Sequence, residues 1–332
     1  YEVTQIKGDG EAHPKLSPED EFADYGTWDK GDIAGVKPKT DAMLPYEYAR
    51  SALQVGLQEQ QRIGVNPFKF GLIGSTDAHT GLAATRDENY WGKFAGTEPS
   101  PERYEHYVIK AFSGDDSLST FAWEEVSAGL AAVWARENTR EAIFEAMQKK
   151  ETFATTGTRI TVRFFGGWAY EENEVYRPDA VSIGYDKGVP MGGDLPERTA
   201  DAPVFMVGAL KDPWAGNLDR IQIVKGWVDE DGDRQEKIYD VICAGRAVSD
   251  GECDGPVGNT VDEANATYLN NIGQAELRVV WSDPDFDPDR PAVYYARVLE
   301  IPTPTWQAYD AHLYGITMPP QVPLSGQERA YT

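Results

Sequence analysis

The sequence is short of basic residues: 31 Lys and Arg stand against 55 Asp and Glu, giving a formal net charge of −24. These cations form no basic patch, which argues against nucleic acid as a partner. Long hydrophobic runs are also missing. No stretch approaches the roughly 18 apolar residues that a membrane span requires, so we expect no membrane insertion. With only four histidines in the chain, an imidazole-based site has few candidates.

Cysteine is equally scarce. The two cysteines, Cys243 and Cys253, are separated by nine residues that are typical of a loop able to fold back. We predict a disulfide between them, the alternative being two unpaired thiols in a cytosolic protein. The acidic composition, together with this bond, favours a periplasmic or secreted location.

The length of 332 residues predicts about two domains of roughly 150 residues each. The first half alternates strand-like and helical patterns. Apolar spacing predicts a helix over 45–63, ended by Gly64, and a strand over Lys69–Ile73. A second helix is predicted from Asn138, as part of a capping box with Glu141, to about residue 150. We expect an α/β domain over residues 1–159.

Beyond Thr158 the pattern changes. Fourteen of the 21 prolines lie after residue 160, and turn clusters separate short β-rich runs. This pattern is typical of an antiparallel β-sandwich, which we predict over residues 160–332. Its expected strands are 160–165, 204–209, 220–224, 238–243, 276–281 and 293–300.

The segment Asp77-Ala78-His79 is the strongest chemical motif. It directly follows the predicted strand 69–73, and at i and i+2 in an extended segment the carboxylate and the imidazole point to the same side. Such a pair can reach one metal ion. The alternative is an ordinary turn with a surface histidine.

Glu11-Ala12-His13 repeats this spacing after the strand-like segment Val3–Ile6. His13 is a candidate ligand or proton shuttle, and Glu11 a candidate ligand or general base. A solvated acidic loop is the alternative.

Other motifs are weaker. Thr155–Arg159 offers hydroxyls and one guanidinium that could hold a substrate, or it is a turn that joins two domains. Asp229–Asp233 predicts a hairpin tip, because it lacks the spacing of a calcium loop. Asp283–Asp289 is an acidic loop that is usually solvated and could gather a hard cation. Nucleophile-elbow and phosphate-loop motifs are absent.

Several longer strings are familiar: QIKGDGEAHPKLSPEDEFADY, GSTDAHTGL, ETFATTGTRITVRFF, DRIQIVKGW, VGNTVD and YYARVLEIPTPTW. Across the whole chain they resemble the bacterial domain-of-unknown-function 3604 family. That family is similar to the polymerase and histidinol phosphatase (PHP) superfamily of metal-dependent hydrolases, and to its carbaryl-hydrolase-like members. The resemblance implies the C-terminal part of a distorted α/β barrel over 1–159, followed by the β-sandwich.

The resemblance also implies roles for residues. The last metal motif of the superfamily, an Asp-x-His, falls on Asp77 and His79, while Glu11 and His13 match the family's own Glu-x-His-Pro string. The superfamily's first His-x-His motif and its middle ligands are absent. Because Tyr1 begins in a strand-like segment without an initiator Met, we expect the chain to be a fragment or processed product, partnered by an upstream half of the same barrel. Thr305 stands where the family's string has Arg.

Two functions follow as hypotheses. The first is a metal-dependent hydrolase of ester, amide or phosphoester bonds, in which divalent Zn, Mn or Fe ions activate water for attack on a small-molecule substrate. Asp77, His79 and His13 would bind metal, Glu11 and His13 would serve as base or proton shuttle, and Arg159 or Lys7 would orient the substrate. The second is a secreted, non-catalytic binding module whose barrel is degenerate.

Overall fold

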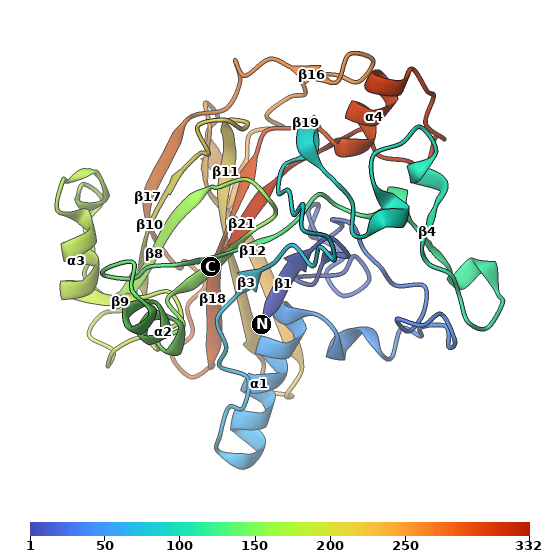
Figure 1. Ribbon diagram of the computed structural model, residues 1–332. Coiled ribbons are helices and arrows are strands. Elements are labelled where there is room, and N and C mark those ends of the chain that lie inside the picture. Colours follow the sequence, from blue (N-terminus) through green and yellow to red (C-terminus); the bar gives the residue numbers. More distant parts are fainter.

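The computed structural model describes all 332 residues as a mixed α/β protein with mostly antiparallel sheets and few helices (Figure 1). Its α-helices are α1 (Ala49–Ile63), α2 (Arg140–Gln148), α3 (Ala180–Lys187) and α4 (Trp306–Tyr314). No helix combines the length and the apolar character that crossing a membrane requires.

Two antiparallel sheets pack on one core. The six-stranded sheet has the order β12 (Arg234–Cys243), β11 (Leu218–Val228), β18 (Ala292–Glu300), β21 (Arg329–Tyr331), β7 (Thr152–Thr155) and β6 (Leu130–Val133). The four-stranded sheet has the order β17 (Glu276–Ser282), β10 (Val204–Leu210), β8 (Thr161–Gly167) and β9 (Gly188–Pro190). An 18-residue buried cluster draws on both sheets. All six strands predicted after residue 160 are confirmed. β11 is buried along nearly its whole length, as is typical of a strand inside a sheet that is covered on both faces.

The six-stranded sheet contains strands from both sides of residue 159, the predicted domain boundary. β7 belongs to the six-stranded sheet and pairs with β21 near the end of the chain, whereas β8, which follows directly, belongs to the four-stranded sheet. Residues before 159 therefore complete a sheet that is otherwise built from the second half.

The first half also contains a three-stranded sheet with the order β2 (Gly8–Asp9), β1 (Glu2–Gln5) and β3 (Ile73–Gly74). β1 and β3 are parallel and are connected through α1, as in a βαβ unit. None of the sheets closes into a barrel. The predicted strand 69–73 overlaps β3 only at Ile73, because residues 69–72 form no strand.

Helix ends follow local chemistry. α1 ends at Gly64, whose φ of 80° is the left-handed conformation that glycine adopts freely, as predicted. The cap of α2 lies one residue after the predicted Asn138: it is Thr139, which is extended and whose hydroxyl accepts a hydrogen bond from the Ala142 amide. The helices α3 and α4 were not predicted.

Four two-stranded antiparallel sheets complete the fold: β4 (Tyr107–Ile109) with β5 (Thr120–Phe121), β13 (Val248–Ser249) with β14 (Glu252–Cys253), β15 (Val261–Asp262) with β16 (Thr267–Tyr268), and β19 (Thr303–Pro304) with β20 (Ser325–Gly326). Asp229–Asp233 is the predicted hairpin tip, between β11 and β12, where Asp229 Oδ1 accepts hydrogen bonds from the Asp231 and Asp233 amides.

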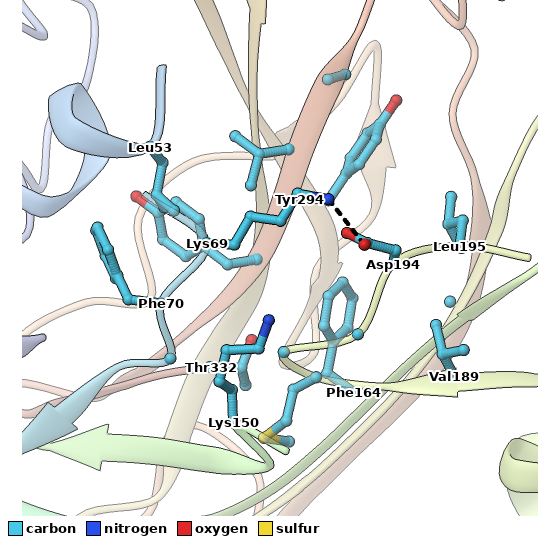
Figure 2. Close-up of a pocket in the computed structure, with 18 of the residues that line it drawn as sticks. Leu53, Lys69, Phe70, Lys150, Phe164, Val189, Asp194, Leu195, Tyr294 and Thr332 are labelled. Atoms are coloured by element: carbon cyan, nitrogen blue, oxygen red, sulfur yellow. Dashed lines mark hydrogen bonds and ion pairs between the residues drawn. The ribbon is translucent and has the colours of Figure 1, made fainter. Parts of the chain in front are cut away.

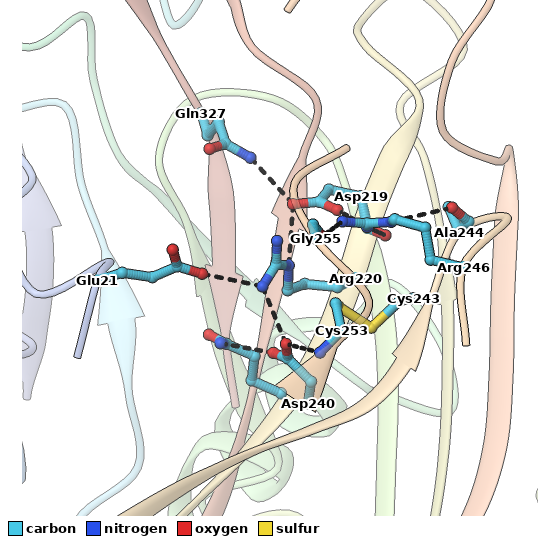
Figure 3. The surroundings of a disulfide bond; sticks show 11 residues. Glu21, Asp219, Arg220, Asp240, Cys243, Ala244, Arg246, Cys253, Gly255 and Gln327 are labelled. Carbon is cyan, nitrogen blue, oxygen red and sulfur yellow. Dashed lines mark hydrogen bonds and ion pairs between the residues drawn. A yellow bond between two sulfur atoms is a disulfide. The ribbon is translucent and has the colours of Figure 1, made fainter. Parts of the chain in front are cut away.

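The predicted disulfide between Cys243 and Cys253 is present (Figure 3). It links the end of β12 to β14 across Cα atoms 5.9 Å apart. Beside it the Cys253 amide donates to Asp240 Oδ2 at 2.9 Å, and the same carboxylate pairs with Arg220. The disulfide therefore holds the loop between β12 and β14 beside the buried ion pair of Asp240 and Arg220.

Replacing both cysteines with alanine is expected to lower the free energy of unfolding by roughly 2–3 kcal/mol, because the bond restricts a short loop in the unfolded chain. Denaturant titration of parent and variant measures this difference. Thiol titration of the denatured, unreduced parent is expected to find no free thiol. Two free thiols would contradict both the bond and the periplasmic assignment.

Candidate functional site

The candidate site lies at the carboxyl ends of the parallel strands β1 and β3. Lys7 follows β1 and Asp77 follows β3, so the two side chains meet at the same edge of the sheet. One oxygen of Asp77, Oδ2, forms ion pairs with Lys7 and with Lys93, whose ammonium also donates to the Asp77 carbonyl at 3.0 Å. Two ammonium groups therefore converge on one carboxylate.

Asp77 and His79 come together as their spacing predicts. Asp77 Oδ1 lies 3.1 Å from His79 Nε2, and the His79 amide donates to the Lys93 carbonyl at 2.6 Å. The His79 side chain is 59% exposed and that of Asp77 is 21% exposed, so solvent reaches the pair. Asp77 has a φ of 49°, a conformation that Asp and Asn tolerate better than most residues and that is enriched at functional sites.

The charge of this cluster is set by its lysines. Burial raises the pKa of Asp77, but hydrogen bonds and charge from Lys7 and Lys93 outweigh burial and lower it to about 2. The Asp77 carboxylate is therefore ionised at neutral pH. Desolvation lowers the pKa of Lys93, whose side chain is 8% exposed.

Sequence reasoning missed two acidic residues near this site. Glu125 is buried, and its Oε2 accepts a hydrogen bond from the Tyr90 hydroxyl at 2.7 Å, whereas its Oε1 has no partner. Burial raises its pKa to about 7, against the opposing effects of Tyr90 and Lys93. Burial likewise raises the pKa of Asp9 to about 8, with Glu11 adding to the effect. No local motif marks either residue, because burial arises from distant segments.

A polar cleft of about 480 Å³ opens beside Lys7. Asp9, Lys30, Tyr48 and Glu124 also line it, so it presents charges of both signs to a small polar molecule. An apolar cavity of about 310 Å³ lies elsewhere, where Leu53, Phe70, Phe164 and Tyr294 contribute to its walls (Figure 2). None of the predicted site residues lines the apolar cavity.

Glu125 predicts a pH effect on stability. Its pKa in the folded chain lies above the unfolded value of 4.5, so the folded state holds this proton and loses stability as pH rises from about 4.5 to about 7. The Glu125→Gln variant is expected to lose less stability than the parent between pH 5 and pH 8. Denaturant unfolding at both pH values measures the difference, with exposed Glu102→Gln as control. Equal pH dependence in the parent and Glu125→Gln would contradict this origin.

Glu11 is placed in a buried ion-pair network away from solvent. Its Oε1 accepts bonds from Arg50 and from the Tyr295 hydroxyl, and its Oε2 accepts one from Arg297 at 3.0 Å. Both arginines also bind Asp20. Burial raises the pKa of Glu11, but the two arginines outweigh burial, and the net shift is downward. Both oxygens of Glu11 are thus already engaged.

His13 is also buried, with a side chain 3% exposed. Its Nδ1 accepts a hydrogen bond from the Lys15 amide at 3.1 Å, so the proton resides on Nε2, which lies 3.1 Å from Asp29 Oδ2. The ring of Tyr48 packs edge-on against it. These contacts fix the orientation of the His13 imidazole.

Arg159 has an exposed side chain, and its amide donates to Asp212 Oδ2 at 2.9 Å. It follows Thr155–Thr158, which is buried between the sheets' ends. No hydrogen bond or ion pair joins Arg159, Glu11 or His13 to the pair formed by Asp77 and His79. Of the six residues predicted for the site, the structure brings Lys7, Asp77 and His79 together.

The donor chemistry of Asp77 and His79 fits a divalent metal. One carboxylate oxygen and one imidazole nitrogen on the same side of a loop are ligands that Zn, Mn and Fe accept. They are two ligands of the four or more that such ions require. The one group of three possible donors elsewhere, Asp240 with Cys243 and Cys253, is committed to the disulfide and to Arg220.

The fold and the site together define a mixed α/β protein with an exposed carboxylate and imidazole pair at the end of a βαβ unit. Residues 1–332, the whole chain, match the family described as "Protein of unknown function (DUF3604)", and the chain belongs to this family. The predicted resemblance to the domain-of-unknown-function 3604 family is thereby confirmed, whereas the link to the PHP superfamily stays a prediction. No match is found among curated proteins or among solved structures.

Proposed function

We propose that the chain forms part of a metal-dependent hydrolase that cleaves ester, amide or phosphoester bonds. The observation that carries the proposal is the convergence of Asp77 Oδ1 and His79 Nε2, 3.1 Å apart and open to solvent, at the carboxyl ends of two parallel strands. Enzymes with α/β sheets place their chemistry at this edge. Asp77 and His79 would hold a Zn, Mn or Fe ion, which would supply a water acidified to near neutral pH.

The remaining residues of the site would bind and orient the substrate. Lys7 lies between the metal pair and the polar cleft, so its ammonium is placed to attract an anionic or carbonyl oxygen. Lys93 fixes the orientation of Asp77. Glu125, with a pKa of about 7, is able to hold or release a proton near this cluster at neutral pH.

Glu11 and His13 enter the proposal as positioning residues. Ion pairs saturate Glu11, and hydrogen bonds on both nitrogens orient His13. They hold the loop after β1 that carries Lys7 and lines the cleft. Arg159, the last residue of Thr155–Arg159, is exposed, so its guanidinium would be free to reach a substrate from solvent.

We further propose the architecture that the family resemblance implies. Residues 1–159 would contribute the C-terminal part of a PHP-like α/β barrel, and residues 160–332 would form a β-sandwich domain whose six-stranded sheet is completed by β6 and β7 from the first part. The parallel β1–α1–β3 unit supports the first part, and the core shared by two antiparallel sheets supports the second. The missing metal ligands would come from an upstream half of the same barrel, in a periplasmic or secreted bacterial protein.

One observation favours the second candidate, a non-catalytic binding module. Lys7 and Lys93 already neutralise the Asp77 carboxylate, so the cluster is electrostatically satisfied by its own residues. For a binding module with this cluster, neither the metal content nor any hydrolysis would depend on Asp77. The two functions are therefore separated by metal analysis.

The test uses the 332-residue chain and, in parallel, the full gene product. Each is dialysed against Zn²⁺, Mn²⁺ or Fe²⁺, its bound metal is quantified, and it is assayed with p-nitrophenyl acetate, p-nitrophenyl phosphate, bis-p-nitrophenyl phosphate and 1-naphthyl N-methylcarbamate. The proposal expects bound metal and metal-dependent cleavage in the gene product. Metal-free protein that binds none of these ions would favour the binding module.

A further inference from the structure

The apolar cavity of Figure 2 has the features of a binding site for a small molecule. Its lining comes from α1, from the segment before β3, and from β8, β9 and β18, so segments of both halves of the chain meet around it. Aromatic and aliphatic side chains form most of the wall, among them Leu53, Phe70, Phe164, Val189, Leu195 and Tyr294. Its volume of about 310 Å³ is at the lower end of the roughly 300–1,000 Å³ of known ligand pockets, which favours a small ligand.

Two lysines and one carboxylate supply the charge of this lining. Lys69 is paired with Asp194 at 2.8 Å, and both side chains are well exposed, at 44% and 72%. Lys150, in contrast, is partly buried, and its ammonium forms no ion pair or hydrogen bond. Figure 2 shows this ammonium pointing into the cavity. The lining therefore carries one unpaired positive charge, and an anionic group is the partner that it lacks.

The backbone holds Lys150 in a strained conformation at the cavity wall. Its φ is 60°, and its amide donates to the Met147 carbonyl at 3.0 Å in the turn that follows α2. Glycine is usual at this position after a helix, and a lysine there costs free energy. Two glycines pack directly on it, since an added Cβ would lie 3.0 Å from the Lys150 Cβ at Gly71 and 2.6 Å from it at Gly192, closer than carbon atoms normally approach. The stem of this side chain is therefore fixed before a ligand binds.

An apolar wall with one free cation selects an amphipathic anion. The apolar part of such a ligand gains free energy by leaving water, and a carboxylate gains a charge-assisted hydrogen bond from the ammonium. A phosphate monoester carries up to two negative charges, more than one free ammonium compensates. A neutral or cationic ligand would leave Lys150 without a partner. A single carboxylate on a short apolar chain matches both the charge and the volume of the cavity.

We propose that this cavity binds a small amphipathic carboxylate, of which a medium-chain fatty acid is the simplest, with the carboxylate on the Lys150 ammonium and the chain against Phe70 and Phe164. Phe70 precedes β3 in the chain, whereas Asp77 follows it, so the cavity and the candidate active site lie at opposite ends of this strand. They share no residue. The proposal is therefore independent of the proposed hydrolase function.

The experiment measures the affinity of the chain for octanoate at neutral pH by titration calorimetry, with acetate, 1-octanol and octylammonium as comparison ligands. Octanoate is expected to bind at least about tenfold more tightly than each of the three, because acetate lacks the apolar chain and the other two lack the negative charge. Lys150→Met, which keeps an unbranched side chain and removes the charge, should weaken octanoate binding at least about tenfold and leave 1-octanol binding unchanged. Lys150→Arg, which keeps the charge, should retain most of the affinity for octanoate.

Two controls make the result specific. Lys149→Met removes the adjacent lysine, which is 59% exposed and paired with Glu145, and should keep the octanoate affinity of the parent. His79→Ala should also keep it, which separates this cavity from the proposed hydrolase site. Melting temperatures of the ligand-free variants, expected to match that of the parent, show that they fold. No octanoate binding, equal affinities for octanoate and octylammonium, or an unchanged octanoate affinity in Lys150→Met would each overturn the proposal.

Discussion

The Arg297→Met variant is expected to lose about 3–5 kcal/mol of its free energy of unfolding, because it leaves buried carboxylates without their counter-ion. Arg297 is 0% exposed and forms hydrogen bonds to Glu11 at 3.0 Å and to Asp20 at 2.6 and 2.9 Å. Its Nε also donates to Gln222 at 2.8 Å. Arg50 alone would remain to compensate two ionised acids in a dry interior.

Urea-induced unfolding of parent and variant measures this loss. Arg278→Met is the matched control, since Arg278 forms an exposed pair with Glu276 and its removal should cost less than about 1 kcal/mol. A loss in Arg297→Met no larger than in the control would contradict the structural role given to this network. The same network accounts for the placement of Glu11 as a positioning residue: Glu11→Gln should lower stability along with any activity.

The second large effect is expected at the candidate active site. Asp77→Asn and His79→Ala should each reduce metal-dependent hydrolysis by at least about 100-fold, because each removes a proposed metal ligand. Stability should change little in metal-free His79→Ala, because the His79 side chain is 59% exposed. Asn tolerates the positive φ of position 77, but Asp77→Asn removes the counter-ion of Lys93, whose side chain is 8% exposed, so this variant should lose more stability than His79→Ala.

His312→Ala is the control, since His312 lies on α4 and its Nδ1 is 3.2 Å from the Ala264 carbonyl. Activity is measured as kcat and KM with the substrate that the parent cleaves fastest, and stability as the melting temperature in EDTA. Retained hydrolysis in His79→Ala would exclude this histidine as a ligand. A loss of activity that is accompanied by a large drop in melting temperature would indicate unfolding instead.

Local chemistry explains which parts of the fold could be predicted. Gly64 ends α1, and short β-rich runs between turn residues mark the six predicted strands, because both signals reside in neighbouring residues. The two-residue β3 and the helices α3 and α4 depend on packing between distant segments, which periodicity does not record. The cap on Thr139 instead of Asn138 shows the same limit at the scale of one residue.

The site divides in the same way. The contact between Asp77 and His79 follows from a spacing of two residues, so a motif was enough to find it. Lys93 reaches Asp77 from 16 residues away, and Arg297 reaches Asp20 from 277 residues away. Such distant partners also determine that Glu11 contacts arginines and not solvent, which its local sequence does not reveal.

The most direct test of the hydrolase proposal is a crystal structure of the full gene product grown with zinc, with anomalous data collected at the zinc edge. The proposal predicts an anomalous peak at roughly 2.0–2.2 Å from both His79 Nε2 and an Asp77 carboxylate oxygen. Lys7 or Lys93 would then have moved off that carboxylate. A map with no peak at this pair, and with both lysines still bound to Asp77, would contradict it.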